Sequence, residues 1–495
     1  MNKQGMNNAV MALAVAAALA CCCLASANEP RVRFISHRGE SLDAPENTMT
    51  SFRSAVARKA DGFECDIYLT KDNGIICIHD GTTKRTANQD LVVSNSTLSE
   101  LRALDAGVRK GPQFKGERLP TLAELLSLAH DQFEIYVEVK CGPEVVPQLV
   151  KEMAAEPKAT PDRVLFICFK TNVVAALRQQ LPAYRTYWLT GTKVNDKGQP
   201  VPSATDAVAA AKACNASGID AKASVALSAE YVREVKNAGL SFHVWTVDEA
   251  SLAAELSAMG VDTITSNCGA ELAALSRARP EGRPLVCWAF DGAATNSGCG
   301  GSAFDAVVGG TPVYTNGIEG RALVLDGTNA GPHVVCPLPK QGSIALWYRP
   351  SALYNFNTVF DTDRHPDQWE MWITDKGVLR FRMDKKLGDV SCDLTRMGGA
   401  DRWHHLALVW DSVSTNRMWL YVDGQSRASS AITQWVAPGG VITMGGGNAK
   451  NIKGRGWLDD MRMYLQPLSE AQVRALYAVR AVDSVEGGLG RPGHK

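Results

Sequence analysis

A regular alternation of short apolar runs and amphipathic helical stretches over residues 31–276 sets the narrowest limit on how this chain can fold. Apolar runs bounded by turn residues are typical of buried strands, and helices between them imply parallel pairing. Eight such units predict a closed (β/α)8 TIM barrel. An open doubly wound sheet is the alternative, but no G-x-G-x-x-G follows the first run. The expected strands are Val32–Ser36, Phe63–Thr70, Phe133–Lys140, Val164–Phe169, Thr186–Thr190, Gly218–Ala223, Phe242–Val247 and Thr263–Ser266.

Two local features refine this barrel. Lys71–Gly74 ends in Asn-Gly between two apolar runs, which predicts a hairpin from the second strand to Ile75–His79. Residues 80–120 then form a polar insertion before the third barrel unit. Asp248 is well placed to cap the helix that follows it. The expected helices are Thr48–Lys59, Leu122–His130, Val145–Ala155, Ser228–Ala238 and Glu249–Met259.

The pattern changes around Arg277–Pro284, which reads as a linker. Beyond it, short strand-like runs separated by Gly, Asn and Asp predict an all-β jelly-roll sandwich, with one helix at Ser469–Ala478. We therefore expect a multidomain chain. Its segments are a signal peptide at 1–27, a barrel at 28–280, a β-sandwich at 281–480 and a disordered tail at 481–495.

The N-terminus has the features of a signal peptide. Lys3 provides a positive end, Val10–Cys23 is a short apolar run, and Ala25–Ala27 forms an A-x-A cleavage site. An uncleaved anchor is the alternative. Cleavage predicts a secreted, periplasmic or cell-surface protein, and no later apolar run is long enough for a membrane span. Lys+Arg and Asp+Glu both number 52, so no basic excess points to nucleic acid.

The chain has 13 cysteines, of which Cys21, Cys22 and Cys23 leave with the signal peptide. The six that precede residue 280 lie mostly in apolar runs and are expected to behave as buried small hydrophobes. An oxidising compartment permits disulfides. The four later cysteines could form one or two bridges, whose pairing the sequence does not assign. These four are Cys287, Cys299, Cys336 and Cys392.

Charged and imidazole side chains interrupt several barrel strands near their carboxyl ends, where barrel enzymes carry their sites. Residues two apart in a strand share a face, so each of two pairs points to one side. A buried charge without a partner is costly, which favours a shared site over unrelated surface residues. The residues are His37 and Arg38 on the first strand, the pair Glu64 and Asp66, His79, and the pair Glu138 and Lys140.

This set suggests one chemistry. Three carboxylates without a cysteine suit a hard cation, Ca²⁺ or Mg²⁺, rather than zinc. Arg38 and Lys140 beside that cation would surround an anion, most naturally a phosphate. Two imidazoles can serve as general acid and general base near neutral pH. The set therefore predicts metal-supported cleavage of a phosphoester.

Motifs in the same region resemble the glycerophosphodiester phosphodiesterase family. They are HRG (37–39), PENT (45–48), FECDIYLTKD (63–72), HD (79–80), VEVK (137–140), VWTVD (244–248) and GVDTITSN (260–267), and the resemblance covers residues 31–275. It implies a TIM barrel that hydrolyses glycerophosphodiesters to glycerol 3-phosphate and an alcohol with a divalent cation.

Carried over by position, the resemblance implies His37 and His79 as the acid/base pair and Glu64, Asp66 and Glu138 as metal ligands. Arg38 and Lys140 would hold the phosphate, and Trp245 would pack against the glycerol. Glu46 and Asn47 are expected to brace the loop of His37 and to cap the helix that follows. Asp248 stands where the family often has Asn, and Ser266–Cys268 replaces an Asp-x-Pro turn. We place both departures on the glycerol side, where they bear on substrate identity.

The second half resembles concanavalin-like and laminin-G-like modules. The resemblance rests on SIALWYRP (343–350), DRWHHLALVWD (401–411), MWLYVDGQ (418–425) and WLDDMRMYLQPLSEAQVRALY (457–477). It implies a glycan or protein ligand, and a purely structural sandwich is the alternative. His404 and His405 are adjacent in a strand and should not share a metal. Trp369, Trp372 and Trp435 could stack on sugars or pack in the core.

The sequence therefore predicts a secreted metal-dependent glycerophosphodiester phosphodiesterase with an accessory sandwich. A related phosphodiesterase acting on lysolipids or glycerol-phosphate polymers is the enzymatic alternative. A non-catalytic glycan- or protein-binding protein is disfavoured, because every expected ionisable position is filled. Which imidazole is the acid, and whether water or the neighbouring hydroxyl attacks, stay open.

Overall fold

A computed structural model gives the fold. It describes residues 31–277, 283–308, 311–327, 331–336, 338–362, 369–383, 389–436, 441–446 and 454–486. The predicted signal peptide, most of the linker and residues 487–495 of the predicted tail lie outside these ranges. Within them, no helix combines the length and the apolar character that crossing a membrane requires.

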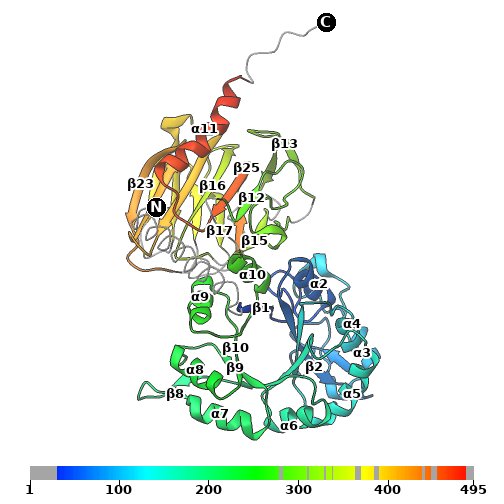
Figure 1. The fold of residues 1–495 in the computed structure, drawn as a ribbon. Helices are drawn as coiled ribbons and strands as arrows, with labels where there is room; N and C mark the ends of the chain where they lie inside the picture. Colours follow the sequence, from blue (N-terminus) through cyan, green and yellow to red (C-terminus); the bar gives the residue numbers. More distant parts are fainter. Residues whose placement is uncertain are drawn as a thin grey trace, which may run out of the picture.

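Eight parallel strands close into a barrel in the first half of the chain (Figure 1). The first strand pairs with both the second and the last, which closes the ring and excludes an open sheet. The predicted barrel is confirmed, with strand ends shifted by one or two residues. The strands are β1 (Arg33–Ser36), β2 (Gly62–Leu69), β4 (Glu134–Val139), β5 (Val164–Cys168), β6 (Thr186–Thr190), β9 (Gly218–Lys222), β10 (Ser241–Trp245) and β11 (Thr263–Ser266).

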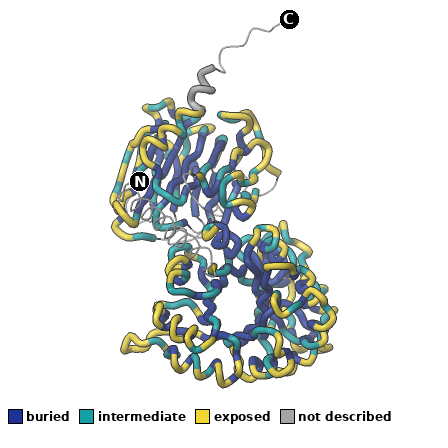
Figure 2. Tube along the Cα trace, viewed as in Figure 1, coloured by how far each residue is buried: buried dark blue, intermediate teal, exposed yellow. Residues whose placement is uncertain are grey.

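The period of two along each strand separates the barrel interior from the layer beneath the helices. In β4, Ile135 and Val137 pack in the main apolar core, whereas Tyr136 joins a separate cluster with Ile35 and Leu165 inside the barrel. Figure 2 shows buried strands and an outer ring of helices with exposed flanks. The ring consists of α2 (Met49–Ala57), α4 (Leu122–Leu126), α5 (Val146–Ala155), α6 (Thr171–Gln180), α7 (Ala204–Ala213), α8 (Ala229–Asn237), α9 (Ala250–Ala258) and α10 (Gly269–Arg277).

The predicted helices form, although α4 ends four residues before His130. The predicted cap of α9 is wrong: Glu249 occupies the N-cap position and makes no side-chain cap bond. Asp248 cannot cap because Asn267 and Ser266 already donate to its carboxylate. The predicted hairpin is confirmed, since β3 (Ile75–Cys77) pairs antiparallel with β2. The insertion after it contains α3 (Leu98–Arg102).

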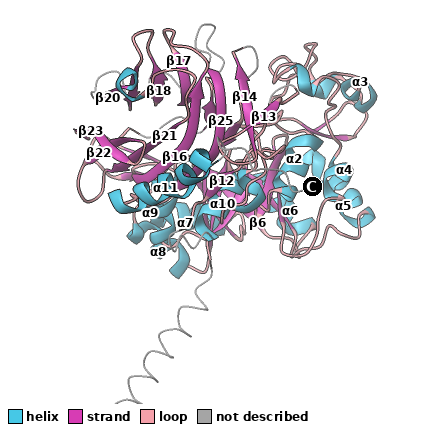
Figure 3. Cartoon of the chain, turned by 90° about the horizontal axis from the view of Figure 1, so that it is seen from above, coloured by secondary structure: helices cyan, strands magenta, loops and turns pink. Residues whose placement is uncertain are grey.

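The second half is built almost entirely from antiparallel strands, in contrast to the mixed first half (Figure 3). Among the described residues, one sheet runs β13-β14-β25-β16-β21-β22-β23 with β12 on β25, and the other runs β15-β24-β17-β18-β19-β20. The predicted sandwich is confirmed. Its strands are β12 (Val286–Trp288), β13 (Tyr314–Asn316), β14 (Arg321–Asp326), β15 (His333–Val335), β16 (Gln341–Pro350), β17 (Asn357–Thr362), β18 (Glu370–Ile373), β19 (Val378–Arg382), β20 (Asp389–Asp393), β21 (His404–Asp411), β22 (Arg417–Val422), β23 (Gln425–Ala431), β24 (Val441–Met444) and β25 (Arg455–Tyr464).

Aromatic residues fill the space between the two sheets. Trp369 and Trp410 are both fully buried and meet edge to face at 5.3 Å. Trp372 is also buried, and the half-buried Trp435 packs against Trp369. Trp369 is therefore a core residue, whereas Trp372 lies on the other face of β18, where Arg380 and Arg382 cover its ring. The last helix, α11 (Glu470–Glu486), continues eight residues beyond its predicted end and includes the start of the predicted tail.

His404 and His405 behave as expected for adjacent strand residues. Nε2 of His404 bonds the carbonyl of Gly399 at 3.0 Å, whereas the ring of His405 contacts Trp347 and Tyr477. Burial lowers the pKa of His405 to about 4. Both imidazoles are part of the packing, and they share no ligand position among the described residues.

The ten cysteines in the described ranges are all free. The one or two bridges that the last four cysteines could have formed are thus not present in this structure. Cys336 is buried with its sulfur 3.3 Å from Sδ of Met463, and Cys392 lies on β20 opposite Leu379. In the barrel, all six but Cys141 are buried, as predicted for small apolar side chains.

Arg58, the C-cap residue of α2, joins the barrel to the sandwich. Its Nε donates to the carbonyl of Ala303, in the 3₁₀ turn η4 (Gly301–Phe304), at 3.1 Å. The same guanidinium binds Asp43 at 2.6 Å and the fully buried Glu271 of α10. Asp43 belongs to the loop after β1. The sandwich therefore rests on the helix layer through a buried charge that also supports this loop (Figure 1).

Candidate active site

The predicted residues meet at the carboxyl ends of the barrel strands, around a cavity of about 270 Å³. Seven of the eight line it, and Asp66 lies fully buried beside them. The cavity has a charged half from β1 to β4 and a largely apolar half from β5 to β11. Its lining is His37, Arg38, Glu64, His79, Glu138, Lys140, Ile167, Phe169, Leu189, Asp220, Trp245, Thr246 and Thr265.

A left-handed turn at the end of β1 positions the side chains of His37 and Arg38 at the cavity. Arg38 has φ 57° and Gly39 has φ 75°. A Cβ on Gly39 would lie 2.5 Å from Oγ of Ser51, so only glycine fits. The backbone N–H of Arg38 donates to Glu64 at 3.0 Å. The turn thus sets His37 and Arg38 against β2.

Asn47 braces this turn, as the sequence predicted. Its backbone N–H donates to the carbonyl of Arg38 at 3.0 Å. Its side chain donates to Asp66 at 2.8 Å and accepts from the Asp66 backbone at 3.1 Å. The predicted capping role is wrong, because Thr48 is the N-cap of α2 and forms a capping box with Ser51. Asn47 instead fixes one carboxylate of the cluster.

Glu64, Asp66 and Glu138 present oxygens that all lie within 4.8 Å of one another. Burial and the charge of Asp66 raise the pKa of Glu64 well above its usual value and that of Glu138 to about 7. Burial also opposes the charge of Asp66, but Lys140 and Arg38 outweigh it and lower the pKa of that carboxyl. Oε1 of Glu64 and Oδ1 of Asp66 are buried without a hydrogen bond. Three crowded carboxylates with free oxygens fit a hard metal cation.

Two cations flank the carboxylates. Nζ of Lys140 lies 2.8 Å from Glu138 and 3.4 Å from Asp66, and Nε of Arg38 lies 3.3 Å from Asp66. Arg38 also donates to Glu46 at 2.9 Å. Both cationic side chains reach the cavity wall. The three carboxylates outnumber these two cations by one. A divalent metal ion together with a singly charged phosphodiester would bring the total charge to zero.

His37 is held by a chain of polar groups that reaches β11. Its Nδ1 lies 2.7 Å from Oδ1 of Asn267, whose amide nitrogen donates to Asp248 at 2.8 Å. This fixes the Asn267 amide, so Nδ1 of His37 carries the hydrogen and Nε2 faces the cavity. Burial and the charge of Arg38 lower the pKa of His37. Nε2 is therefore a free lone pair 3.9 Å from Glu64.

His79 has a different partner. Its Nδ1 lies 2.6 Å from Asp80, a carboxylate that also accepts from Arg85 at 2.7 Å. The bond from Arg85 is the main reason that the pKa of Asp80 falls to about 2. Arg85 also binds Glu46 with two nitrogens, so it links the loop of His79 to that of Arg38.

The apolar half of the cavity is centred on Trp245. Its ring nitrogen donates to the backbone carbonyl of Asp220 at 3.2 Å, and its ring meets Phe169 edge to face at 5.8 Å. The expectation that Asp248 and Asn267 lie on the glycerol side is wrong. Neither lines the cavity, because both stand behind His37 and orient it.

Sequence reasoning missed Asp220 and Arg85 as members of the site, and it missed the bond from Asn267 to His37. Asp220 is fully inside the barrel, and burial followed by the charge of Glu138 raises its pKa to about 8. It is a carboxylate in an apolar strand, the same signal that identified Glu138. Asn267 and Arg85 carry no such signal, because their roles depend on partners far away in the sequence.

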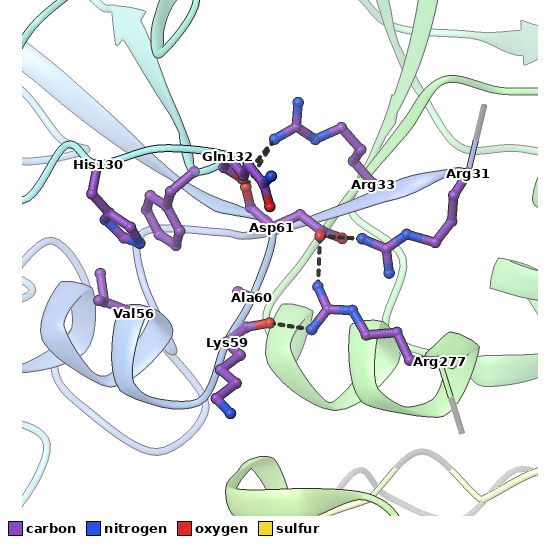
Figure 4. Close-up of a pocket in the computed structure, with 10 residues that line it drawn as sticks. Arg31, Arg33, Val56, Lys59, Ala60, Asp61, His130, Gln132 and Arg277 are labelled. Carbon is purple, nitrogen blue, oxygen red and sulfur yellow. Dashed lines mark hydrogen bonds and ion pairs between the residues drawn. The ribbon is translucent and has the colours of Figure 1, made fainter. Parts of the chain in front are cut away.

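A larger hollow of about 600 Å³ lies at the amino ends of the strands (Figure 4). Asp61 stands at its centre and binds Arg31 and, at 2.6 Å, Arg277. Arg33 binds Glu134 at 2.8 Å and the carbonyl of Asp61. Asp61 thus joins Arg31 and Arg277, which lie at the two ends of the barrel segment. We assign this hollow a structural role.

Comparison with known proteins agrees with this geometry. Residues 37–268 match the Glycerophosphoryl diester phosphodiesterase family, and residues 326–474 match the Concanavalin A-like lectin/glucanases superfamily. A glycerophosphodiester phosphodiesterase of Caldanaerobacter subterraneus is 37% identical over 151 residues, which is 30% of this chain and 62% of that protein. The Bacillus subtilis protein YhdW, named as a glycerophosphodiester phosphodiesterase, is 33% identical over 47% of this chain and 93% of its own.

Among solved structures, an Oleispira antarctica phosphodiesterase in complex with sn-glycerol-3-phosphate covers 50% of this chain and 97% of its own, with 25% identity and a TM-score of 0.45. The match to YhdW spans almost all of that relative. The barrel is that of a phosphodiester hydrolase. This chain belongs to the glycerophosphodiester phosphodiesterase family.

Proposed function

We propose that this protein hydrolyses glycerophosphodiesters to glycerol 3-phosphate and an alcohol. The observation that carries the proposal is the buried triad of Glu64, Asp66 and Glu138 within one small cavity that also holds two imidazoles and two cations. Family membership supports the same reaction. The cavity volume of about 270 Å³ suits a glycerophosphate group rather than a lipid chain.

The metal is proposed to be Ca²⁺ or Mg²⁺, held by the triad. Carboxylate oxygens without sulfur or imidazole are the ligands both ions prefer. When bound, such an ion would polarise the phosphoryl oxygens and lower the cost of charge in the transition state. Arg38 and Lys140 would bind the remaining phosphate oxygens.

The two imidazoles divide the proton transfers. Nε2 of His37 takes the proton of the attacking oxygen as that oxygen bonds to phosphorus. The ester bond to the alcohol then breaks, and His79 gives a proton to the departing oxygen. The partners support this division: Nδ1 of His37 is held by the amide of Asn267, whereas Nδ1 of His79 is held by the carboxylate of Asp80. The attacking oxygen belongs to water or to the neighbouring glycerol hydroxyl. Attack by the hydroxyl would give a cyclic phosphate, and water would then break one of its ring P–O bonds to give glycerol 3-phosphate.

The proposal also includes export and an accessory role for the sandwich. Export rests on the N-terminal sequence alone, and a mature protein that begins at Asn28 would support it. A glycan or protein ligand of the sandwich rests on the family match. Cell fractionation and mass measurement of the mature chain test the first, and a glycan array tests the second.

The test of the reaction is a substrate screen with purified protein. Glycerophosphocholine, lysophosphatidylcholine and a glycerol-phosphate polymer are compared by release of glycerol 3-phosphate, before and after chelation and re-addition of Ca²⁺ or Mg²⁺. We expect the first substrate to be preferred and chelation to stop turnover. Undiminished turnover after chelation would contradict the metal site, and preference for another substrate would select that alternative.

A further inference from the structure

We propose that Asp220 is a specificity-determining residue whose carboxyl group bonds a hydroxyl of the substrate's glycerol. This inference rests on the proposed function and adds a residue to it. Asp220 is the one acidic side chain on the β5–β11 half of the cavity lining. The other members of that half are apolar or hydroxylic.

The carboxyl group makes no hydrogen bond to any residue that the structure describes. Asp220 is 1% exposed, and both of its oxygens are buried without a hydrogen bond. Glu134, inside the same barrel, is a useful contrast: it is equally buried, but Arg33, Arg185 and Tyr136 bind it. A buried polar group without a partner costs free energy and is rarely retained without a role. The missing partner of Asp220 is therefore expected from the cavity.

A hydroxyl is the donor that fits this position. It can donate to an ionised carboxylate, and it can both donate to and accept from a protonated one, so it suits either state. On its own half of the cavity Asp220 has apolar neighbours such as Ile167 and Leu189, and the carboxylates of the opposite half form the triad that we assign to the metal. A neutral polyol is thus better matched here than an ammonium group.

The position also agrees with the place of the phosphate. Arg38 and Lys140 lie on the opposite half of the cavity, so a glycerol attached to the phosphate extends toward β9 and β10. The carbonyl of Asp220 holds the indole of Trp245 at 3.2 Å. Asp220 therefore has two roles in the proposal. Its carbonyl orients the indole against which the glycerol carbons pack, and its carboxyl group bonds a hydroxyl of the glycerol.

The experiment compares two substrates with and without the hydroxyls. Wild type, Asp220→Leu and Asp220→Asn are assayed on glycerophosphocholine and on bis(p-nitrophenyl) phosphate, with Glu134→Gln as the buried-carboxylate control. We expect Asp220→Leu to lower kcat/KM on glycerophosphocholine about 10- to 100-fold, the range for a hydrogen bond to an ionisable group. On the nitrophenyl diester its rate should stay within about twofold, because no hydroxyl is lost. Asp220→Asn should keep part of the preference for glycerophosphocholine. The Glu134→Gln control should show no substrate-selective loss.

A second measurement does not depend on turnover. Glycerol 3-phosphate should protect wild type from thermal unfolding more than inorganic phosphate does, and in Asp220→Leu the two should protect equally. Equal losses on both substrates, or no loss on either, would overturn the role of Asp220. Wild type that cleaves only the nitrophenyl diester would instead refute the proposed function, and with it this inference. If the leucine variant does not fold, the same comparisons with Asp220→Asn decide.

Discussion

The two ends of the barrel both gather charged side chains, but among the described residues of the barrel strands only those at the carboxyl end include carboxylate oxygens without a hydrogen bond. At the amino end, Asp61 binds Arg31 and Arg277, and Glu134 binds Arg33 and Arg185. At the carboxyl end, buried oxygens of Glu64, Asp66 and Asp220 make no hydrogen bond.

The amino end also has the larger hollow, about 600 Å³ against about 270 Å³. Neither the size of a hollow nor its number of charges therefore identifies the reactive end. Buried carboxylates without hydrogen-bond partners identify it. The free-energy cost of removing them from water is not compensated until a metal or substrate binds.

The largest expected effect comes from the triad. Asp66→Asn should lower kcat at least about 10³-fold, since metal charge stabilisation contributes several kcal/mol. The metal-free protein should also melt lower than wild type, because Lys140 and Arg38 stabilise the ionised Asp66 and a neutral amide loses those ion pairs. Steady-state kinetics measure the change in kcat, and calorimetry measures the change in melting temperature. A variant that keeps its activity would remove Asp66 from the site.

The imidazoles come next. His37→Ala and His79→Ala should each lower kcat about 10²-fold or more, the usual contribution of general acid–base catalysis. Asn267→Ala should lower kcat less, because the imidazole of His37 remains and only the bond that orients it is lost. A shifted pH–rate profile for Asn267→Ala, without a change in melting temperature, would distinguish orientation from stability. Wild-type kinetics in either histidine variant would exclude that residue.

Metal binding should stabilise the protein more at pH 8 than at pH 5. The pKa of Glu138 rises from its usual 4.5 to about 7, so the metal-free fold loses stability as pH rises through 7 and Glu138 ionises. The metal binds the ionised form and offsets that loss. With metal at about 100 times its Kd, the gain at pH 8 is about 2.7 kcal/mol. Thermal shifts at both pH values measure it, and an equal gain would contradict the linkage.

The smallest effects belong to the paired end. Asp61→Asn should cost about 1–2 kcal/mol, because its arginine partners are partly exposed and solvent screens them. Activity should stay within about twofold. Chemical denaturation and kinetics on the same preparation test this. A loss of activity without a loss of stability would mean that this hollow is functional.

Much of the site could be predicted from the sequence because strand periodicity is local. Glu64 with Asp66, and Glu138 with Lys140, are two residues apart, and a charge in an apolar strand is visible without a structure. Partner choice is not local. Asp248 has the sequence of a helix cap, but Asn267 occupies its carboxylate, and the four later cysteines form no bridge.

The sequence by itself determined the barrel, the sandwich and the side chains that reach the active rim. Those features follow from the spacing of apolar residues and from the order of strands and helices along the chain, and both can be seen in short stretches of sequence. Tertiary structure alone decided which charges are satisfied. Asp61 and Asp220 are both buried aspartates of barrel segments, yet Arg31 and Arg277, from the two ends of the chain segment that forms the barrel, bind Asp61 and not Asp220. Whether a buried carboxylate is structural or reactive depends on atoms brought close by ring closure, across more than two hundred residues of chain.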